Sequence, residues 1–169
     1  YGKIRVSDGS LEAEISSGIT TRGNGLIRVE GGTLSTNQIR TSVYGADNVG
    51  GYVQTGGTTH ILGENTTNNY YCFNLTYPGN VFQMTGGTLH IHEAHQRGGI
   101  FIASEEANQK VTGGTVIMEI DDGEDFRITS RAPFWNVIVR NTHSGSGRHI
   151  VADGEDVGDG DLTTLPVQD

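Results

Sequence analysis

The chain has 169 residues, 26 of them glycine, and a formal net charge of −9. This length is enough for one domain with a core of its own, and the glycine content is about twice the average for proteins. An acidic surface with few lysines argues against nucleic acid and anionic membranes as partners, and no apolar run approaches the ~20 residues of a membrane-spanning helix. We therefore expect neither nucleic-acid binding nor membrane insertion.

A Gly-Gly-Thr triplet recurs through the first 120 residues. Asp8-Gly9-Ser10 is a degenerate first copy, and four clear copies follow it. The second glycines of successive copies are 23, 25, 30 and 27 residues apart. A period in this range predicts a stack of similar structural units. The clear copies are Gly31-Gly32-Thr33, Gly56-Gly57-Thr58, Gly86-Gly87-Thr88 and Gly113-Gly114-Thr115.

Apolar and polar positions alternate on both sides of each triplet. The positions four and two before the first glycine, and three and five after it, are mostly apolar. This alternation predicts a strand, a glycine corner and a second strand, because glycine tolerates the positive φ of a tight corner. Gln54 and Gln109 interrupt the apolar columns and need hydrogen-bond partners if they point inward. A mostly polar column, three before the first glycine, holds Arg5, Arg28, Val53, Gln83 and Lys110.

A unit of about 25 residues is too long for a hairpin and too short for a βαβ unit. It fits a coil of three short strands, the third of which is visible at residues 99–103. We therefore expect an all-β chain folded as a right-handed parallel β-helix, a three-faced solenoid of roughly six to seven coils. The threonine column is expected to form an outward or corner ladder. The alternative, a glycine-rich antiparallel sandwich, gives no reason for fixed core columns beside each triplet.

One β-helix domain is expected over residues 1–169, with regular coils in 1–120 and less regular terminal coils in 121–169. Residues 65–69 and 93–98 are expected to bulge from the stack as loops, and the best helical candidates, 93–97 and 104–110, are expected to be loop excursions. Cys72 lies in an aromatic stretch and is predicted to be a buried small hydrophobic residue. Because the chain begins directly in a predicted strand, we expect it to be a piece of a longer protein.

The acidic, glycine-rich segment 153–161 is the candidate cation site. Carboxylate oxygens suit Ca²⁺, but the spacing does not fit an EF-hand, since Val157 stands where the fifth-position ligand belongs. The tandem glycine-aspartate repeats of calcium-binding β-rolls are also missing. We therefore expect no cofactor, with Ca²⁺ at this segment as the alternative. Its acidic residues are Asp153, Glu155, Asp156, Asp159 and Asp161.

Histidines form a second cluster in the alignment. His60 and His90 occupy the same column, and His92 lies on the same face as His90, with His95 nearby. An imidazole ladder of this kind can bind Zn²⁺, Ni²⁺ or Cu²⁺. No carboxylate or cysteine completes an obvious coordination shell, so we favour a solvated polar face and assign no metal ligand.

Catalytic signals are weak. Asp121 and Asp122 form an acidic pair, but neighbours in a strand point to opposite faces, and hydrolysis of a glycoside needs two carboxylates in one groove. Residues 141–143 and 147–149 faintly resemble polygalacturonase motifs, yet their order is wrong and His143 replaces the expected aspartate. Arg127 and Arg131 would suit a lyase, but nothing fixes them beside an acidic cluster. We assign no catalytic residue and do not expect an enzyme.

Four tyrosines are expected in loops, where a ring is free to stack on a sugar. They are the candidates for a glycan-binding patch. These tyrosines are Tyr44, Tyr70, Tyr71 and Tyr77.

Residues 82–91, 134–142 and 157–163 resemble large secreted surface proteins of Bacteroidetes-type bacteria, in which β-helix coils carry Gly-Gly-Thr-Leu corners. The resemblance implies export, by the type IX route, to the bacterial cell surface or the extracellular medium, and a role as adhesin, stalk or filament. It supplies no catalytic residues. The expected function is therefore a rigid display rod, whose partners are flanking coils of the parent chain, further copies stacked end to end, or surface glycans. The alternatives are a glycan-binding module and a β-helix polysaccharide lyase or hydrolase.

Overall fold

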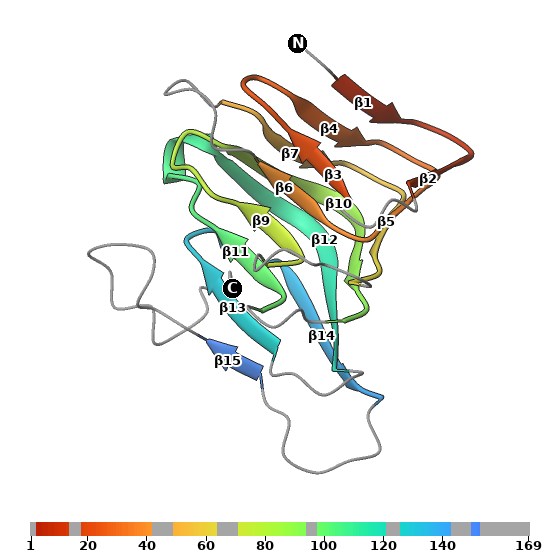
Figure 1. Ribbon diagram of the computed structural model, residues 1–169, viewed down its shortest axis with the longest axis vertical. Helices are drawn as coiled ribbons and strands as arrows, with labels where there is room; N and C mark the ends of the chain where they lie inside the picture. The colour runs from red at the N-terminus through yellow and green to blue at the C-terminus, as the bar shows by residue number, and fades with distance from the viewer. Residues whose placement is uncertain are drawn as a thin grey trace.

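A computed structural model describes residues 3–13, 18–41, 49–63, 71–93, 98–120, 126–142 and 150–152. Within these ranges the regular secondary structure is almost all β-strand, and every described strand pair is parallel. The one described helix is a single 3₁₀ turn, η1 (Glu106–Asn108). The strands are stacked along the longest axis of the molecule, from β1 at the top of Figure 1 to β14 and β15 at the bottom.

Each of the first three turns contributes three strands. The first turn holds β1 (Lys3–Val6), β2 (Ser10–Ala13) and β3 (Ile19–Thr21). The second holds β4 (Leu26–Val29), β5 (Thr33–Thr36) and β6 (Ile39–Thr41), and the third β7 (Gly51–Gln54), β8 (Thr58–Ile61) and β9 (Phe73–Leu75).

In the next two turns the first two strands join across the glycine corner into one long strand. These long strands are β10 (Val81–Ile91) and β12 (Gln109–Ile120), followed by β11 (Ile100–Ile102) and β13 (Phe126–Ser130). Two further strands, β14 (Asn136–Asn141) and β15 (Ile150–Ala152), extend the stack.

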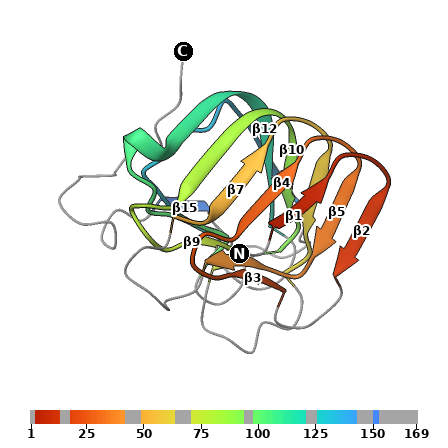
Figure 2. The ribbon, with the colours of Figure 1, turned by 90° about the horizontal axis from the view of Figure 1, so that it is seen from above.

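The strands form two sheets around a common interior, seen from above in Figure 2. The first sheet runs β1-β4-β7-β10 on one side of the corners and β10-β8-β5-β2 on the other, with β12 beside β10 and β14 beside β12. The second sheet runs β15-β13-β11-β9-β6-β3. The expected all-β stack of parallel strands is confirmed as a β-solenoid. The expected count of six to seven coils is not confirmed.

The core lies where the sequence columns placed it. Parallel pairing aligns Ile27 with Tyr52, and Tyr52 with Phe82, all three fully buried. Leu34 and Leu89 are likewise fully buried beyond the corner. Burying side chains of this size stabilises the fold by roughly 1.5–3 kcal/mol each. One hydrophobic cluster contains residues from both sheets, so the two sheets share a single core.

The third copy of the triplet shows why the corner needs two glycines. A Cβ on Gly56 would overlap the carbonyl oxygen of Glu30 in the preceding turn. Gly57 has a φ of +65°, and a Cβ there would lie 2.6 Å from the Gly31 carbonyl carbon and oxygen. The first glycine thus permits close stacking of the turns, and the second permits the left-handed backbone of the corner. The predicted glycine corner is confirmed.

The two glutamines that interrupt the apolar columns differ in their placement. Gln54 is fully buried, and its Nε2 donates a 2.9 Å hydrogen bond to the backbone oxygen of Thr88 in the next turn. Gln109 is only partly buried, and its Nε2 donates to the Ser104 oxygen at 2.6 Å. Both glutamines therefore have the partners that an inward-facing amide requires.

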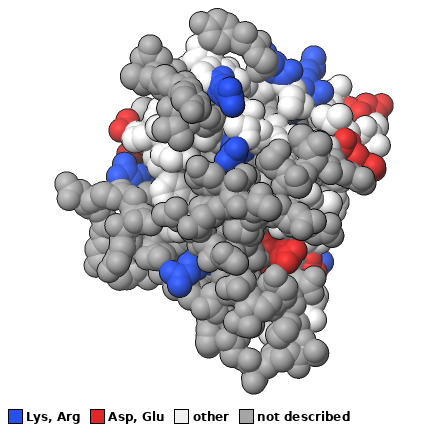
Figure 3. Space-filling model, in the orientation of Figure 1, with Lys and Arg blue, Asp and Glu red and all other residues white. Residues whose placement is uncertain are grey.

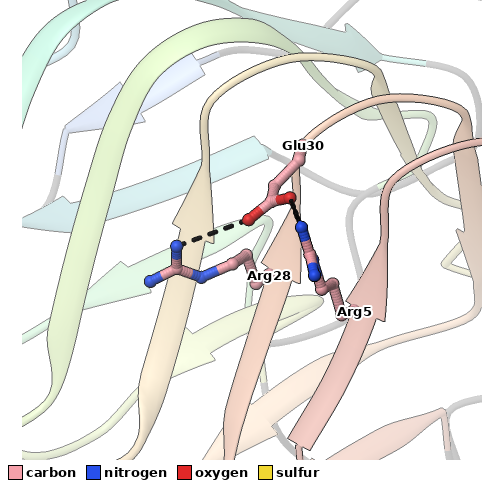
Figure 4. A network of polar contacts seen from close by, with 3 residues as sticks. All are labelled: Arg5, Arg28 and Glu30. Carbon is pink, nitrogen blue, oxygen red and sulfur yellow. Dashed lines mark hydrogen bonds and ion pairs between the residues drawn. The ribbon is translucent and has the colours of Figure 1, made fainter.

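The polar column before the corner is exposed at Arg5, Arg28 and Lys110, whereas Val53 in the same column is buried. Arg5 and Arg28 are paired in register on β1 and β4, which stacks two like charges. Glu30 lies between them, with Oε2 2.6 Å from Arg5 Nη2 and Oε1 3.4 Å from Arg28 Nη1 (Figure 4). The carboxylate thus offsets the repulsion that two stacked guanidinium groups would otherwise cause.

Other expectations have mixed outcomes. Cys72 is fully buried in the core, as predicted, and its Sγ lies 3.2 Å from the backbone oxygen of Glu93. The candidate helix at 104–110 holds only the single turn η1 and runs into β12. The Gly-Gly-Thr motif ends before Ile120, but the strand pairing continues, with β13 on β11 and β14 on β12.

Candidate metal centre

Three histidines gather on the outer face of two neighbouring turns. His60 lies on β8 and is paired in register with His90 on β10. His92 follows the end of β10, and its backbone N–H donates a 2.9 Å hydrogen bond to the Ile61 oxygen, so the ladder continues past the strand. Because side chains alternate along a strand, His90 and His92 project to the same side. The predicted imidazole ladder is thus formed by these three residues, while His95 lies outside the described residues.

A carboxylate from the next turn joins the histidines. Glu119 Oε2 lies 2.7 Å from His90 Nε2 and 3.1 Å from His92 Nδ1. Sequence reasoning missed this residue because the aligned columns extended only to five positions after the first glycine. His92 and Glu119 each stand six positions after the first glycine of their own triplet. Because Ile91 is paired with Met118, the residues that follow them, His92 and Glu119, lie side by side. No carboxylate was expected to complete a coordination shell here; the structure places the Glu119 carboxylate beside two of the three histidines.

The polar atoms of the cluster are linked by hydrogen bonds. A carboxylate only accepts, so His90 Nε2–H and His92 Nδ1–H both donate to Glu119. A neutral His92 then has an unprotonated Nε2, which accepts from His60 Nδ1–H at 2.8 Å. With both nitrogens of His92 protonated, its Nε2–H would instead donate to His60 Nδ1.

The environment of His60 favours its neutral imidazole. Burial, followed by the proximity of His92, lowers the pKa of His60 below its ordinary value. The His90 and Glu119 side chains are only 11% and 15% exposed, which is lower than a fully solvated polar face would show. Neutral histidine is the form that ligates metal ions.

The rings are packed closely enough to share one ligand. His90 and His92 stack with centroids 3.7 Å apart, and the His60 ring centroid lies 5.1 Å from that of His92 and 5.6 Å from that of His90. One donor atom from each histidine can be chosen so that all three lie within 4.8 Å of one another. The arrangement therefore offers three nitrogen donors and an adjacent carboxylate oxygen, a donor set suited to transition-metal ions.

The other candidate sites gain little from the structure. The segment 153–161, the pair Asp121 and Asp122, and residues 143–149 all lie outside the described residues. Arg127 lies within β13 and Arg131 directly follows it, whereas the acidic residues of 121–125 lie outside the described residues.

The proposed sugar-stacking aromatics are only partly available. Tyr71 is 4% exposed and packs against Phe101 with ring centroids 5.3 Å apart, so its ring is not free to stack on a sugar. Tyr77 is partly buried. Tyr44 and Tyr70 lie outside the described residues.

No protein-family model, curated protein or solved structure matches this chain. Among the described residues, no helix is long and apolar enough to cross a membrane. On the face shown in Figure 3, the described lysines and arginines form small separate groups, with acidic side chains between and beside them.

Proposed function

We propose that this chain is a structural or adhesive segment of an exported bacterial cell-surface protein and acts as a rigid display rod. Its neighbours would be further β-helix coils, either from the same parent chain or from another copy stacked end to end. The resemblance of its corner and strand motifs to large secreted surface proteins supports export and surface location. A solenoid suits this role because each turn contacts only its neighbours and the stack can be extended by further turns.

The observation that carries the proposal is the exposure of core columns at both ends of the stack. On β14, Val137 and Val139 are paired with the core residues Val116 and Met118, yet they are 36% and 54% exposed. At the opposite end, Leu11 on β2 is paired with the fully buried Leu34 and is 39% exposed. Apolar positions that every inner turn buries are therefore left uncovered at the two ends.

The strand edges at the two ends support the same proposal. Among the described strands, β1, β2 and β3 each pair on one side only, as do β14 and β15. A parallel edge with unpaired backbone groups is a template for another strand. Contact between the β14 end of one copy and the β2 end of the next would be head to tail, and such contacts build open filaments. We take the coil to be right-handed and three-faced, since parallel crossovers are right-handed in about 98% of cases.

Negative-stain electron microscopy and light scattering after size exclusion test this proposal on the purified chain. We expect rods longer than one molecule, with a mass that rises with protein concentration. Val139→Lys places a charge in the exposed core column and should abolish the assembly. Ile138→Lys is the matched control. Ile138 is 41% exposed on the same strand, but it is paired with Ile117 and belongs to the column that projects away from the core.

Equal assembly by the two lysine variants would contradict stacking through the core columns. A monomer at all concentrations would contradict end-to-end self-association. Immunogold labelling of intact source cells tests location, since label confined to the cell interior would contradict surface display. Binding of the monomeric chain to a glycan array would favour the glycan-binding alternative.

A further inference from the structure

We propose that His60, His90, His92 and Glu119 form a binding site for a transition-metal dication, with Zn²⁺ as its ligand. The site goes beyond the rod function and does not depend on it. Its four side chains come from three consecutive turns, on β8, at and just beyond the end of β10, and on β12. A bound ion would therefore tie these three turns together on the outside of the stack.

The geometry needs only small side-chain adjustments to hold an ion. Tetrahedral Zn²⁺ with Zn–N bonds of ~2.0–2.1 Å places neighbouring donor atoms ~3.3 Å apart. The three histidine donors lie within 4.8 Å of one another, and Glu119 Oε2 is within 3.1 Å of two of the rings. The distances still to be closed are within reach of rotation about the imidazole side-chain bonds. The backbone of the ladder stays in place.

The donor set selects the class of ion. Three imidazole nitrogens and one carboxylate oxygen suit Zn²⁺, Cu²⁺ and Ni²⁺, whereas Ca²⁺ and Mg²⁺ require oxygen ligands. A dication would also be attracted by the carboxylate of Glu119, which contacts two of the rings. Cys72 Sγ lies against the backbone oxygen of Glu93 in the core and contributes no thiolate.

The hydrogen-bond network without metal is the competing explanation for the cluster. In that network Glu119 accepts two N–H groups and His60 donates to His92, so these three contacts are explained without an ion. A metal would replace the protons that these atoms share, and binding would release protons or change tautomers. The two explanations therefore differ in whether the four residues take up Zn²⁺ stoichiometrically.

Isothermal titration of the metal-stripped full chain with ZnCl₂ tests the proposal. We expect one ion per chain, reversal by a chelator, and no competition from excess Ca²⁺. Titration with Co²⁺ should give the visible absorption bands of a tetrahedral nitrogen and oxygen site. At a free Zn²⁺ concentration about 100 times Kd, the melting temperature should rise by roughly 5–10 °C.

Two variants and a matched control connect binding to these residues. His92→Asn and Glu119→Gln should each weaken Zn²⁺ binding at least 10-fold, since even residues behind the ligands typically contribute 10- to 100-fold. Glu12→Gln is the control for Glu119, because Glu12 projects outward from β2 on the same side of the corners but two turns before His60. Circular dichroism establishes that each variant keeps its strand content.

The results separate the two explanations even if one variant fails to fold. Absence of stoichiometric Zn²⁺ uptake by the wild-type chain would overturn the proposal. So would equal uptake by a folded Glu119→Gln chain, because other histidines in the sequence would then account for the binding. A tetrahedral Co²⁺ spectrum in the wild-type chain, lost in either variant and kept in Glu12→Gln, would establish the site.

Discussion

The hydroxyl oxygens of Tyr52 and Thr59 lie 2.6 Å apart inside one turn, on opposite sides of the glycine corner. Tyr52 has a single proton to donate, and it donates that proton to Gln54 Oε1 at 2.7 Å, since an amide oxygen only accepts. Thr59 is therefore the donor to Tyr52. A polar chain of three fully buried residues thus fixes the two arms of the corner relative to each other.

Removing the threonine from this chain should destabilise the fold. We expect Thr59→Val to lower the free energy of unfolding by roughly 1–3 kcal/mol, because it leaves the buried tyrosine oxygen without its donor. Urea denaturation followed by circular dichroism measures the effect. The neighbouring Thr58 is only partly buried, so Thr58→Val should change stability by less than about 0.5 kcal/mol. Equal effects of the two variants would contradict the assignment.

Stability should fall above pH 10 because of Tyr52. Burial raises the pKa of its phenol well above the ordinary value of 10.0, so the folded chain keeps it neutral while the unfolded chain ionises it. The stabilisation is complete below pH 10 and is lost as the pH rises beyond it, by up to about 1.4 kcal/mol per pH unit. Urea titrations between pH 8 and pH 11 should show this loss. Tyr52→Phe should have a flatter profile over the same range, and an unchanged slope would contradict the argument.

The two requirements for corner glycines can be measured separately. Gly9 has a φ of +70° with no atom within 4 Å of the position that a methyl group would take, whereas a methyl group on Gly57 would meet the backbone of the preceding turn. Gly9→Ala should therefore cost only the backbone strain, about 1 kcal/mol. Gly57→Ala adds a steric clash and should cost several-fold more or prevent folding. Similar unfolding midpoints for the two variants would show that the backbone of the preceding turn does not pack closely against Gly57.

The Glu30 carboxylate should titrate below its ordinary range. The hydrogen bond from Arg5, followed by the charges of Arg5 and Arg28, lowers its pKa, so its stabilising contribution is present at neutral pH and lost as the pH falls through that lowered pKa. Side-chain NMR titration reports the midpoint directly. Arg5→Met should raise it, and high salt should raise it in the wild-type chain, because the pair is exposed to solvent. A midpoint that Arg5→Met leaves in place would exclude this explanation.

Much of the fold could be predicted from the spacing of the Gly-Gly-Thr triplets. The positions of Gly32, Gly57 and Gly87 defined the corners, and the columns around them contained the residues that are buried. These signals are local, because a corner needs glycine for its backbone and a core position needs an apolar side chain. The number of turns and the strands beyond Ile120 were harder to predict, since β14 keeps the pairing without keeping the motif.

Only part of the candidate site could be predicted from the sequence. His60 and His90 could be aligned because both stand at a fixed distance from a triplet. Glu119 became a partner because β12 runs on past the last aligned column, in the same register with β10 that the triplets define beyond the corner. The hydrogen bonds of Gln54 also depend on distances across the core, which the sequence alone does not give.

The number of residues between paired strands varies in the second sheet, although the strands stay adjacent. Ile39 follows its partner Ile19 by 20 residues, whereas Phe73 follows Ile39 by 34, yet both steps join strands that are adjacent in the ladder. Extra residues between two paired strands therefore leave those strands adjacent in the ladder. Height grows only by whole turns, each adding about 4.8 Å. The number of turns therefore sets the length of the stack, whereas the segments between paired strands are free to vary in residue number.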